Sequence, residues 1–288
     1  MNALSSFTSP FINFFPNRFW ESKHKTFTVD SKFDNTRKGQ LSTNGLNVYI
    51  NGSHILKNVN VNIPQNKITC IICPSGCGKS TLLRTFNRLN DRIEGLRISG
   101  EVNIGNDNIL SADSFKLTEM RRCIGLVPQR PCPLPMSIYD NIAYGCRIHG
   151  IRGRKELDAI VKHYLKAVGL WEEVENRLFT SASKLSGGQQ QRLCLARSLA
   201  VEPSYLLADE STSALDPISS KKVENLFHDL KNDYSIVMVT HTLRQARRLA
   251  DYVIFMYLGE VVETGYASQV FEDPTNDLTR KYLSGSFS

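Results

Sequence analysis

Nine consecutive residues, 73–81, have the types and spacing that bind phosphate groups. They read CPSGCGKST, in which Gly76 and Gly78 are followed directly by Lys79. Glycine-rich backbone at the start of a helix presents N–H groups to phosphate oxygens, a lysine adds positive charge, and a hydroxyl such as that of Ser80 can be a ligand for Mg²⁺. The segment therefore predicts a loop that binds the phosphates of a nucleotide. Its contributing residues are Cys73, Pro74, Ser75, Gly76, Cys77, Gly78, Lys79, Ser80 and Thr81.

The first residue of this loop, Cys73, stands where such loops usually have glycine. If that position needs a positive φ, a side chain there costs about 1–2 kcal/mol. Such an energy corresponds to a factor of roughly five to thirty in affinity. Because the phosphate-binding donors belong to later residues, we expect a weakened loop that still binds nucleotide. Oxidation of Cys73 is a further way to block the loop, whereas its thiolate is excluded as a nucleophile because bound phosphates would repel it.

Two adjacent carboxylates, Asp209 and Glu210, lie at the end of an apolar run, SYLLAD (204–209), that has the length of a buried strand. In sheets built from alternating strands and helices, ligands bind at the carboxyl ends of the strands. We therefore expect this pair beside the phosphate loop. Asp209 would hold Mg²⁺, directly or through water, and Glu210 would accept a proton from an attacking water molecule.

A second helix start with glycines lies in LSGGQQQR, residues 185–192. An apolar helical pattern follows it, so the backbone N–H groups at this start are expected to be bare and able to bind an anion. The chain has one phosphate loop, and a second anion-binding segment is explained if two copies enclose the nucleotide together. The sequence thus predicts a homodimer in which each copy lends this segment to the other. The residues concerned are Ser186, Gly187, Gly188 and Gln189.

The elements that position these residues alternate along the chain. Helical patterns separate four runs of strand length, of which the first is continuously apolar, and this alternation predicts a mostly parallel sheet wrapped by helices. These runs are residues 68–73, 204–209, 235–241 and 253–258. LNVYI (46–50) and VNVNI (59–63) are predicted as a pair of strands joined by a turn at Asn51-Gly52.

Two stretches depart from this alternation. Residues 1–45 are rich in Phe and Asn, are broken by prolines and show no period, so they are expected to form a disordered extension. A contact of their aromatic residues with a membrane or a partner is the alternative. Residues 46–288 are predicted to form one domain, in which about 130–184 is purely helical and makes an inserted subdomain.

The composition is that of a soluble globular protein, with 41% hydrophobic and 22% charged residues in 288. Of the net charge of +7, residues 1–45 carry +3 (six Lys/Arg against three Asp/Glu), and the remainder is spread thinly. No apolar run reaches the ~18 residues of a membrane span. Seven cysteines without a cleavable signal peptide indicate a reducing compartment, and Cys70, Cys73 and Cys77 lack a fourth ligand for a metal cluster.

The chain resembles the nucleotide-binding subunits of ABC transporters over about 240 of its 288 residues. CPSGCGKST is similar to the Walker A loop of that family except at Cys73, YLLADES is similar to Walker B, and LSGGQ is similar to the family signature. SALD (213–216) is similar to the loop that contacts the second copy, Gln129 stands at the glutamine loop and His241 at the switch histidine. The resemblance implies an α/β P-loop NTPase (RecA-like) core with a mostly parallel sheet, a small antiparallel β part and an inserted α-helical subdomain.

The resemblance also implies hydrolysis of ATP with Mg²⁺. The implied catalytic residues are Glu210, His241, Gln129 and Lys79, and the implied Mg²⁺ ligands are Ser80, Asp209 and Gln129. The implied partners are a second copy of the chain, two transmembrane permease subunits and, indirectly, an extracytoplasmic solute-binding protein, with no nucleic acid. Such a subunit would be peripheral, at the cytoplasmic face of the inner membrane.

Four further segments resemble the PstB-type subunits of phosphate importers, although such a subunit never contacts the cargo. They are NRLND (87–91), PMSIYDNIAYG (135–145), SALDPIS (213–219) and FMYLGEVVETG (255–265). The chain departs from the family where Ile50 replaces an aromatic residue that stacks on adenine, a loss of about 1 kcal/mol. Tyr49 is adjacent but would point to the opposite face of a strand. Departures beside the chemistry, which we expect to change the rate alone, are Pro128, Ala208 and Ser211.

Three alternatives to phosphate import remain at this point. One is an importer ATPase for another small solute. Another is a regulator that binds ATP and hydrolyses it weakly, which Cys73 and Ile50 favour and Glu210 and His241 oppose. A DNA-repair ATPase of the ABC type would need a long coiled coil or a zinc insert before Ser186, and the sequence has neither.

Overall fold

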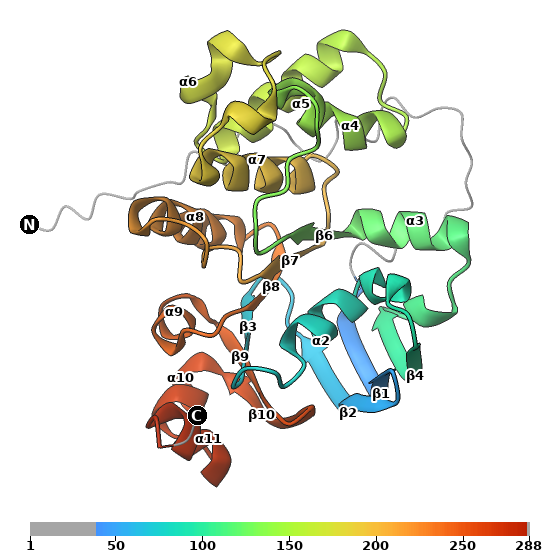
Figure 1. Ribbon diagram of the computed structural model, residues 1–288, viewed down its shortest axis with the longest axis vertical. Helices are drawn as coiled ribbons and strands as arrows, with labels where there is room; N and C mark the ends of the chain where they lie inside the picture. Colours follow the sequence, from blue (N-terminus) through green and yellow to red (C-terminus); the bar gives the residue numbers. More distant parts are fainter. Residues whose placement is uncertain (1–38, 287–288) are drawn as a thin grey trace, which may run out of the picture. The chain divides into compact units, whose positions relative to one another are not determined.

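The computed structural model of the chain describes residues 39–286 (Figure 1). This part contains a six-stranded sheet of order β10-β9-β3-β8-β7-β6 and a four-stranded sheet of order β2-β1-β4-β5. The expected disordered extension lies outside the described residues as far as residue 38.

The six-stranded sheet is the mostly parallel sheet that the apolar runs predict. Only β9 and β10 pair antiparallel, and the other four pairs are parallel. Every residue of β3, β7 and β8 is buried, as expected for continuous apolar runs covered on both faces. Its strands are β3 (Ile68–Ile72), β6 (Ile124–Val127), β7 (Tyr205–Asp209), β8 (Ser235–Val239), β9 (Tyr252–Tyr257) and β10 (Glu260–Tyr266).

The order of these strands decides which loops meet. β8 lies between β3 and β7, with Cys70 and Ala208 both paired to Met238. The three strands are parallel, so the loop after β3 and the carboxylates at the end of β7 leave the same edge of the sheet. The strand β8 ends between them, just before His241.

The four-stranded sheet contains the predicted hairpin. Asn51 and Gly52 have φ values of 48° and 82°, and a two-residue turn with positive φ at both positions fits the twist of the strands that it joins. Order begins at Leu41 rather than near Leu46, because the first residues of β1 pair with β2 on one side and β4 on the other, and Leu41 is fully buried. The strands are β1 (Leu41–Ile50), β2 (Ser53–Ile63), β4 (Leu96–Ile104) and β5 (Asp107–Asn108).

A group of helices lies in the upper part of Figure 1. Between β6 and β7 the described chain forms helices and one isolated bridge, Ser137 to Ser181. The Arg192 guanidinium of α7 forms an ion pair with Glu173 of α6 at 2.8 Å, so the group continues beyond residue 184 into α7. Its helices are α4 (Ile138–Ile148), α5 (Arg154–Ala167), α6 (Trp171–Val174), η5 (Glu175–Arg177), η6 (Ala182–Lys184) and α7 (Gly187–Leu199). That this group is a separate subdomain stays a prediction.

Four of the remaining described helices begin at a short polar side chain that accepts a hydrogen bond from the backbone of the first turn, and they are η4, α3, α8 and α11. Asp113 accepts a hydrogen bond from the Lys116 N–H at the start of α3, and Asp216 caps α8 with Pro217 as the first helical residue. No helix within residues 39–286 is both long and apolar enough to span a membrane. These helices are α2 (Lys79–Thr85), η3 (Leu89–Arg92), η4 (Ile109–Ser111), α3 (Ser114–Cys123), α8 (Pro217–Leu230), α9 (Leu243–Leu249), α10 (Ala267–Glu272) and α11 (Asp277–Leu283).

Candidate active site

The loop between β3 and α2 has the backbone that its glycines permit. Gly76 and Gly78 have φ values of 81° and 97°, which L side chains rarely adopt. A Cβ on Gly78 would also lie 2.8 Å from the Leu56 Cδ2 atom. Cys73 does not adopt a positive φ, so the backbone cost expected for a side chain at this position does not arise.

Lys79, the first residue of α2, is buried and its side chain turns back into the loop. Its Nζ donates hydrogen bonds to the carbonyl oxygens of Cys73 and Pro74, at 3.1 and 3.2 Å. Burial lowers the pKa of Lys79, and the carboxylates of Glu210 and Asp209 oppose that shift. The ammonium group therefore lies near both predicted carboxylates and within the loop that is predicted to bind phosphates.

The structure contains a disulfide between Cys73 and Cys77. This bond was not predicted, because the cysteine usage of the sequence indicated a reducing compartment. The loop holds the two Cα atoms 6.5 Å apart, within the range of disulfide geometry. The other five cysteines form no disulfide. Within the described residues, no group of three His, Cys, Asp or Glu side chains has the arrangement of a metal site.

Asp209 joins the end of β7 to α2. Its side chain is 3% exposed, and its Oδ1 accepts a hydrogen bond from the Ser80 hydroxyl at 2.9 Å. Its Oδ2 accepts two hydrogen bonds from Arg84, from Nη2 at 2.9 Å and from Nε at 3.2 Å. The interpretation of the sequence missed Arg84, although it lies four residues after Ser80 and hence on the same face of the helix.

Glu210 brings together two other predicted residues. Its Oε2 lies 3.1 Å from the Gln129 Nε2, which donates to it, and 3.2 Å from the His241 Nδ1. These residues follow β6, β7 and β8, so three neighbouring strands contribute one side chain each. Glu210 has a φ of 45°, and non-glycine residues held at positive φ are concentrated at functional sites.

The second helix start, Ser186 to Gln189, is capped by its own side chains. The Ser186 Oγ accepts from the Gln189 N–H at 3.3 Å, and the Gln189 Oε1 accepts from the Ser186 N–H at 3.0 Å. Two of the N–H groups expected to be bare are therefore satisfied by this capping box, and those of Gly187 and Gly188 have no acceptor within the helix. No hydrogen bond or ion pair within residues 39–286 links this segment to the loop at 73–81.

Gly188 and Gly187 differ in their surroundings. A Cβ on Gly188 would lie 2.4 Å from the Ser219 Oγ of α8, so this glycine permits close packing of α7 against α8. A Cβ on Gly187 would meet nothing within 4 Å. Gly187 therefore faces open space.

Tyr49 and Ile50 are the last two residues of β1, and that they point to different faces of the strand stays a prediction. Tyr49 stacks on His54 with ring centroids 4.1 Å apart, and the Arg97 guanidinium lies 5.9 Å from the Tyr49 centroid. The aromatic ring beside Ile50 is thus held by its own strand neighbours.

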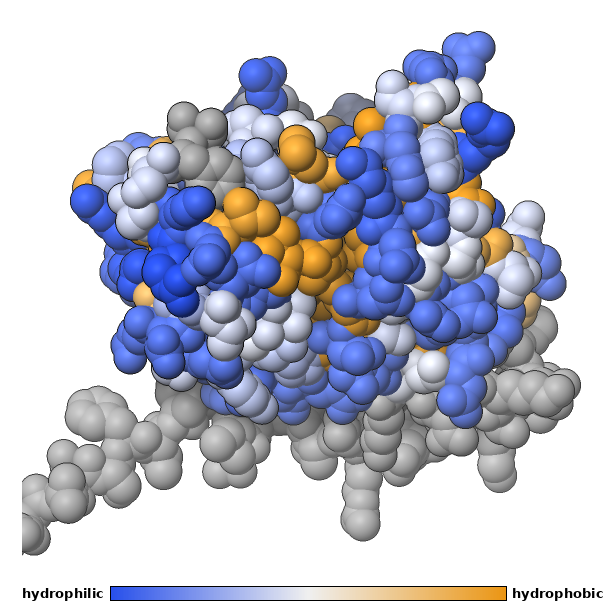
Figure 2. All heavy atoms as spheres, turned by 90° about the horizontal axis from the view of Figure 1, so that it is seen from below, coloured by the Kyte–Doolittle hydropathy of each residue, from blue (hydrophilic) through white to orange (hydrophobic). Residues whose placement is uncertain are grey.

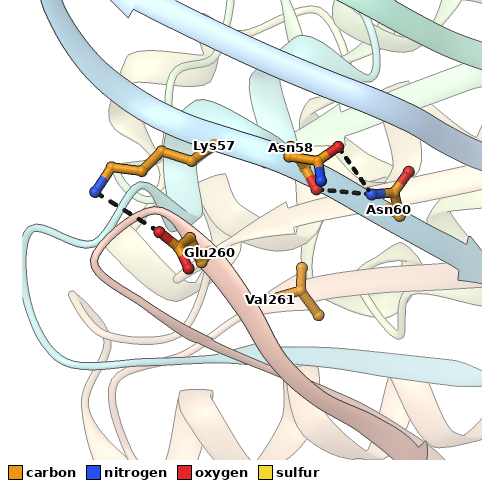
Figure 3. Close-up of a pocket in the computed structure, with 5 residues that line it drawn as sticks. All are labelled: Lys57, Asn58, Asn60, Glu260 and Val261. Carbon is orange, nitrogen blue, oxygen red and sulfur yellow. Dashed lines mark hydrogen bonds and ion pairs between the residues drawn. The ribbon is translucent and has the colours of Figure 1, made fainter.

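One surface pocket lies outside the predicted site. A pocket between β2 and β10 is lined by Lys57, Asn58, Asn60, Glu260 and Val261 (Figure 3). The Lys57 Nζ and the Glu260 Oε1 lie 3.9 Å apart across it, and Asn60 donates to the Asn58 carbonyl. None of these five residues is among those predicted to bind nucleotide. Figure 2 shows apolar side chains gathered in a band between hydrophilic ones on the face seen from below.

Comparison with known proteins identifies the family. Residues 56–213 match the family described as ABC transporter. The chain is 49% identical over 249 residues to the phosphate import ATP-binding protein PstB 3 from each of two strains of Streptococcus pneumoniae, an alignment that covers 86% of this chain and 99% of the relative. Among solved structures, it is similar to cbiO1 from Clostridium perfringens, part of the ABC transporter complex cbiONQ. The TM-score is 0.70 and the identity 28%, over 82% of this chain and 91% of the other.

These relatives cover the loop, both carboxylates and the capped helix start in one alignment of nearly the whole described chain. The sheet of mostly parallel strands, with antiparallel strands and helices added, is the P-loop NTPase fold that the resemblance implied. The chain belongs to the ABC transporter family, as one of its ATP-hydrolysing subunits.

Proposed function

We propose that the chain hydrolyses ATP to drive a phosphate importer, as a homodimer attached to two membrane permease subunits. The identity of the cargo as phosphate is inferred from the 49% sequence identity to phosphate import ATP-binding proteins along 99% of their length. An extracytoplasmic solute-binding protein would deliver phosphate to the permeases. The chain would then be peripheral, at the cytoplasmic face of the inner membrane.

The phosphates of ATP would be bound by the loop at 73–81. Gly76 and Gly78 allow the backbone to turn its N–H groups toward one side, and Lys79 supplies a buried positive charge. In the structure the Lys79 ammonium donates to two loop carbonyls, which are acceptors that phosphate oxygens would replace. Thr81 and Ser80, next in the helix, add hydroxyl groups.

The residues beside the loop fit a hard cation such as Mg²⁺. The Ser80 Oγ and the Asp209 Oδ1 are 2.9 Å apart, so two oxygen ligands already lie side by side. Gln129 donates to Glu210 through its Nε2, which leaves its amide oxygen as the atom that would bind a cation. Mg²⁺ usually takes one or two protein oxygens together with substrate phosphates and water. When bound, it would neutralise charge on the transferred phosphoryl group.

Glu210 would act on the attacking water. Its carboxylate is held between Gln129 and His241, and a carboxylate at such a position accepts the proton that water loses as it attacks. His241, with a side chain 56% exposed, would contact the terminal phosphate. Most of the acceleration would come from positioning and from stabilisation of charge.

The second copy would complete each site. Ser186 to Gln189 is joined to the loop of its own chain by no hydrogen bond within the described residues, and Gly187 faces open space. The N–H groups of Gly187 and Gly188 would therefore bind the nucleotide held by the partner's loop. Closure of the dimer would move the permeases, with Gln129 and the neighbouring helices as the coupling elements.

Uptake measurements test this proposal. In cells that lack the chain, uptake of labelled phosphate should be lost, and the wild-type chain should restore it while Lys79→Ala does not. Labelled sulfate serves as the control anion. Restored uptake of another solute with unchanged phosphate uptake would reassign the cargo, and purified chain without ATP turnover would instead indicate a regulator.

A further inference from the structure

The two cysteines of the phosphate loop lie at its ends and are bonded to each other. Cys73 follows the last residue of β3, and Cys77 precedes the glycine before α2. Together they enclose the three residues 74–76. Both cysteines are buried, at 1% and 5% exposure, whereas Ser75 and Gly76 between them are exposed. A cross-link here fixes the segment that must surround a phosphate.

The sulfur atoms and the Lys79 ammonium gather at one carbonyl group. The oxygen of Pro74 lies 3.1 Å from the Cys73 Sγ, 2.8 Å from the Cys77 Sγ and 3.2 Å from the Lys79 Nζ. The sulfurs of a disulfide carry no proton, so the first two are contacts and not hydrogen bonds. Two thiols at the same positions would each have a proton to donate to this oxygen.

We propose that Cys73 and Cys77 form a reversible oxidation site that switches nucleotide binding by the loop. With the disulfide present, the carbonyls of Cys73 and Pro74 are fixed toward Lys79 and retain its ammonium group. With the disulfide reduced, the segment between the cysteines is free to move and to release Lys79 to the phosphates. The regulatory part of this proposal rests on the proposed role of the loop in ATP binding.

The oxidation balances with a peroxide as the oxidant. The Cys77 sulfur, the more exposed of the two, attacks one oxygen of hydrogen peroxide, breaks the O–O bond and becomes a sulfenic acid with release of water. The Cys73 sulfur then attacks the sulfenic sulfur, the S–S bond forms, and a second water leaves. Two thiols thereby lose two electrons and two protons, and one peroxide becomes two waters. A thiol reductant reverses the reaction by exchange.

The remaining cysteines supply the control. Cys132 is exposed and lies outside the loop, so peroxide will oxidise it without affecting the carbonyls that hold Lys79. Cys70 is fully buried in β3, and burial raises the pKa of its thiol, so it does not compete for the oxidant.

The experiment uses the full chain, reduced with dithiothreitol and desalted, then treated with several equivalents of hydrogen peroxide because the exposed Cys132 also consumes oxidant. Mass spectrometry of the peptide 68–79 under non-reducing conditions locates the bond, and titration with a fluorescent ATP analogue without Mg²⁺ gives affinity. We expect a Cys73–Cys77 bond and an affinity lower by on the order of tenfold, the value of one charge-assisted hydrogen bond. Dithiothreitol should restore the affinity, and bound ATP should slow the oxidation.

Variants separate the possible causes. The affinity of Cys73→Ser should not change upon peroxide treatment, and that of Cys132→Ser should fall as in the wild type. A bond that forms while the affinity changes less than about twofold would overturn the switch, and absence of the 73–77 bond from oxidised protein would overturn the site. Reduced wild-type chain that binds no nucleotide would refute the proposed function instead. Because the decisive comparison is within one protein before and after reduction, a folding defect in a variant does not affect it.

Discussion

The pair formed by Arg84 and Asp209 gives the most direct test of how the site is held together. Replacing Arg84 with Met keeps much of the side-chain volume and removes the two hydrogen bonds to Oδ2. Asp209 then keeps the Ser80 hydroxyl as its one side-chain donor. The carboxylate itself is 3% exposed, whereas the arginine is 48% exposed.

These exposures determine the expected loss of stability. Removing one partner of a fully buried ion pair costs about 3–5 kcal/mol, and an exposed pair contributes about 0.2–1 kcal/mol. Solvent screens the half-exposed arginine, so we expect a loss between these limits, about 1–2 kcal/mol. A chain of this size loses about 2–4 °C in Tm per kcal/mol. The Tm of Arg84→Met should therefore fall by about 2–8 °C.

The same variant should respond more strongly to Mg²⁺ and ATP. Arg84 neutralises the carboxylate that we propose as a cation ligand, so its removal frees Oδ2 and leaves more negative charge at the site. Thermal unfolding with and without Mg²⁺ and ATP measures both effects. Arg92→Met, at an exposed position of η3, is the matched control and should change neither. A Tm within 1 °C of the wild type in the absence of ligands would contradict the argument, as would an unchanged response to Mg²⁺.

Four further substitutions test other parts of the site and fold. Glu210→Gln should retain ATP binding and lose roughly 10²–10⁴-fold in turnover, and normal turnover with normal binding would remove Glu210 from its proposed role. Gly188→Ala should destabilise the chain by about 1–3 kcal/mol because its Cβ would overlap Ser219. Gly187→Ala should not reduce stability. The same Gly187→Ala change should reduce ATPase activity if the partner's nucleotide binds there. Equal unfolding midpoints for the two alanine variants would contradict the packing argument. Asp140 accepts a hydrogen bond from the Ser137 hydroxyl, the main cause that lowers its pKa below 3.8. A carboxyl group with a lowered pKa stabilises the fold at pH values above the pKa of the unfolded state, and this stability is lost as pH falls through the folded pKa. In urea unfolding, Asp140→Asn should therefore be less stable than the wild type at pH 7, and the two free energies of unfolding should converge below about pH 3.8. A difference in stability that persists in acid would point to lost packing instead.

The central strands could be predicted from the sequence because their cause is local. Residues 205–208 are all apolar and residues 68–72 are apolar except for Thr69, which is the pattern expected for strands covered on both faces. The hairpin followed from Asn51-Gly52, since few other residue pairs tolerate positive φ at both positions. In each case the residues that form the element also contain the sequence pattern that predicts it.

Elements that depend on distant pairing could not be predicted in this way. β6 has four residues and is a strand because it pairs with β7, which lies about 80 residues later. The start of β1 at Leu41 depends on β2 and β4 together. A short or polar segment gains its strand conformation from the neighbours that it meets in the folded chain.

The same distinction holds within the site. Lys79, Ser80 and the two carboxylates were predicted because each belongs to a motif whose spacing reflects its chemistry. Arg84 was missed because an arginine within a helix has no such signal until Asp209 lies beside it. Cys73 was interpreted as a defective glycine, and its relation to Cys77 became visible only with the two Cα atoms 6.5 Å apart.

The adjacent carboxylates show how one strand end serves two purposes. Successive side chains of an extended chain point in opposite directions, so Asp209, the last residue of β7, faces Ser80 and Arg84 of α2. Glu210 leaves the strand with a φ of 45° and faces Gln129 and His241, which follow the strands on either side of β7. The strand β8 lies between β3 and β7, so the end of β7 is one strand removed from the loop that follows β3. The two carboxylates that we propose as cation ligand and base, one residue apart in sequence, would therefore act on different atoms of the same nucleotide.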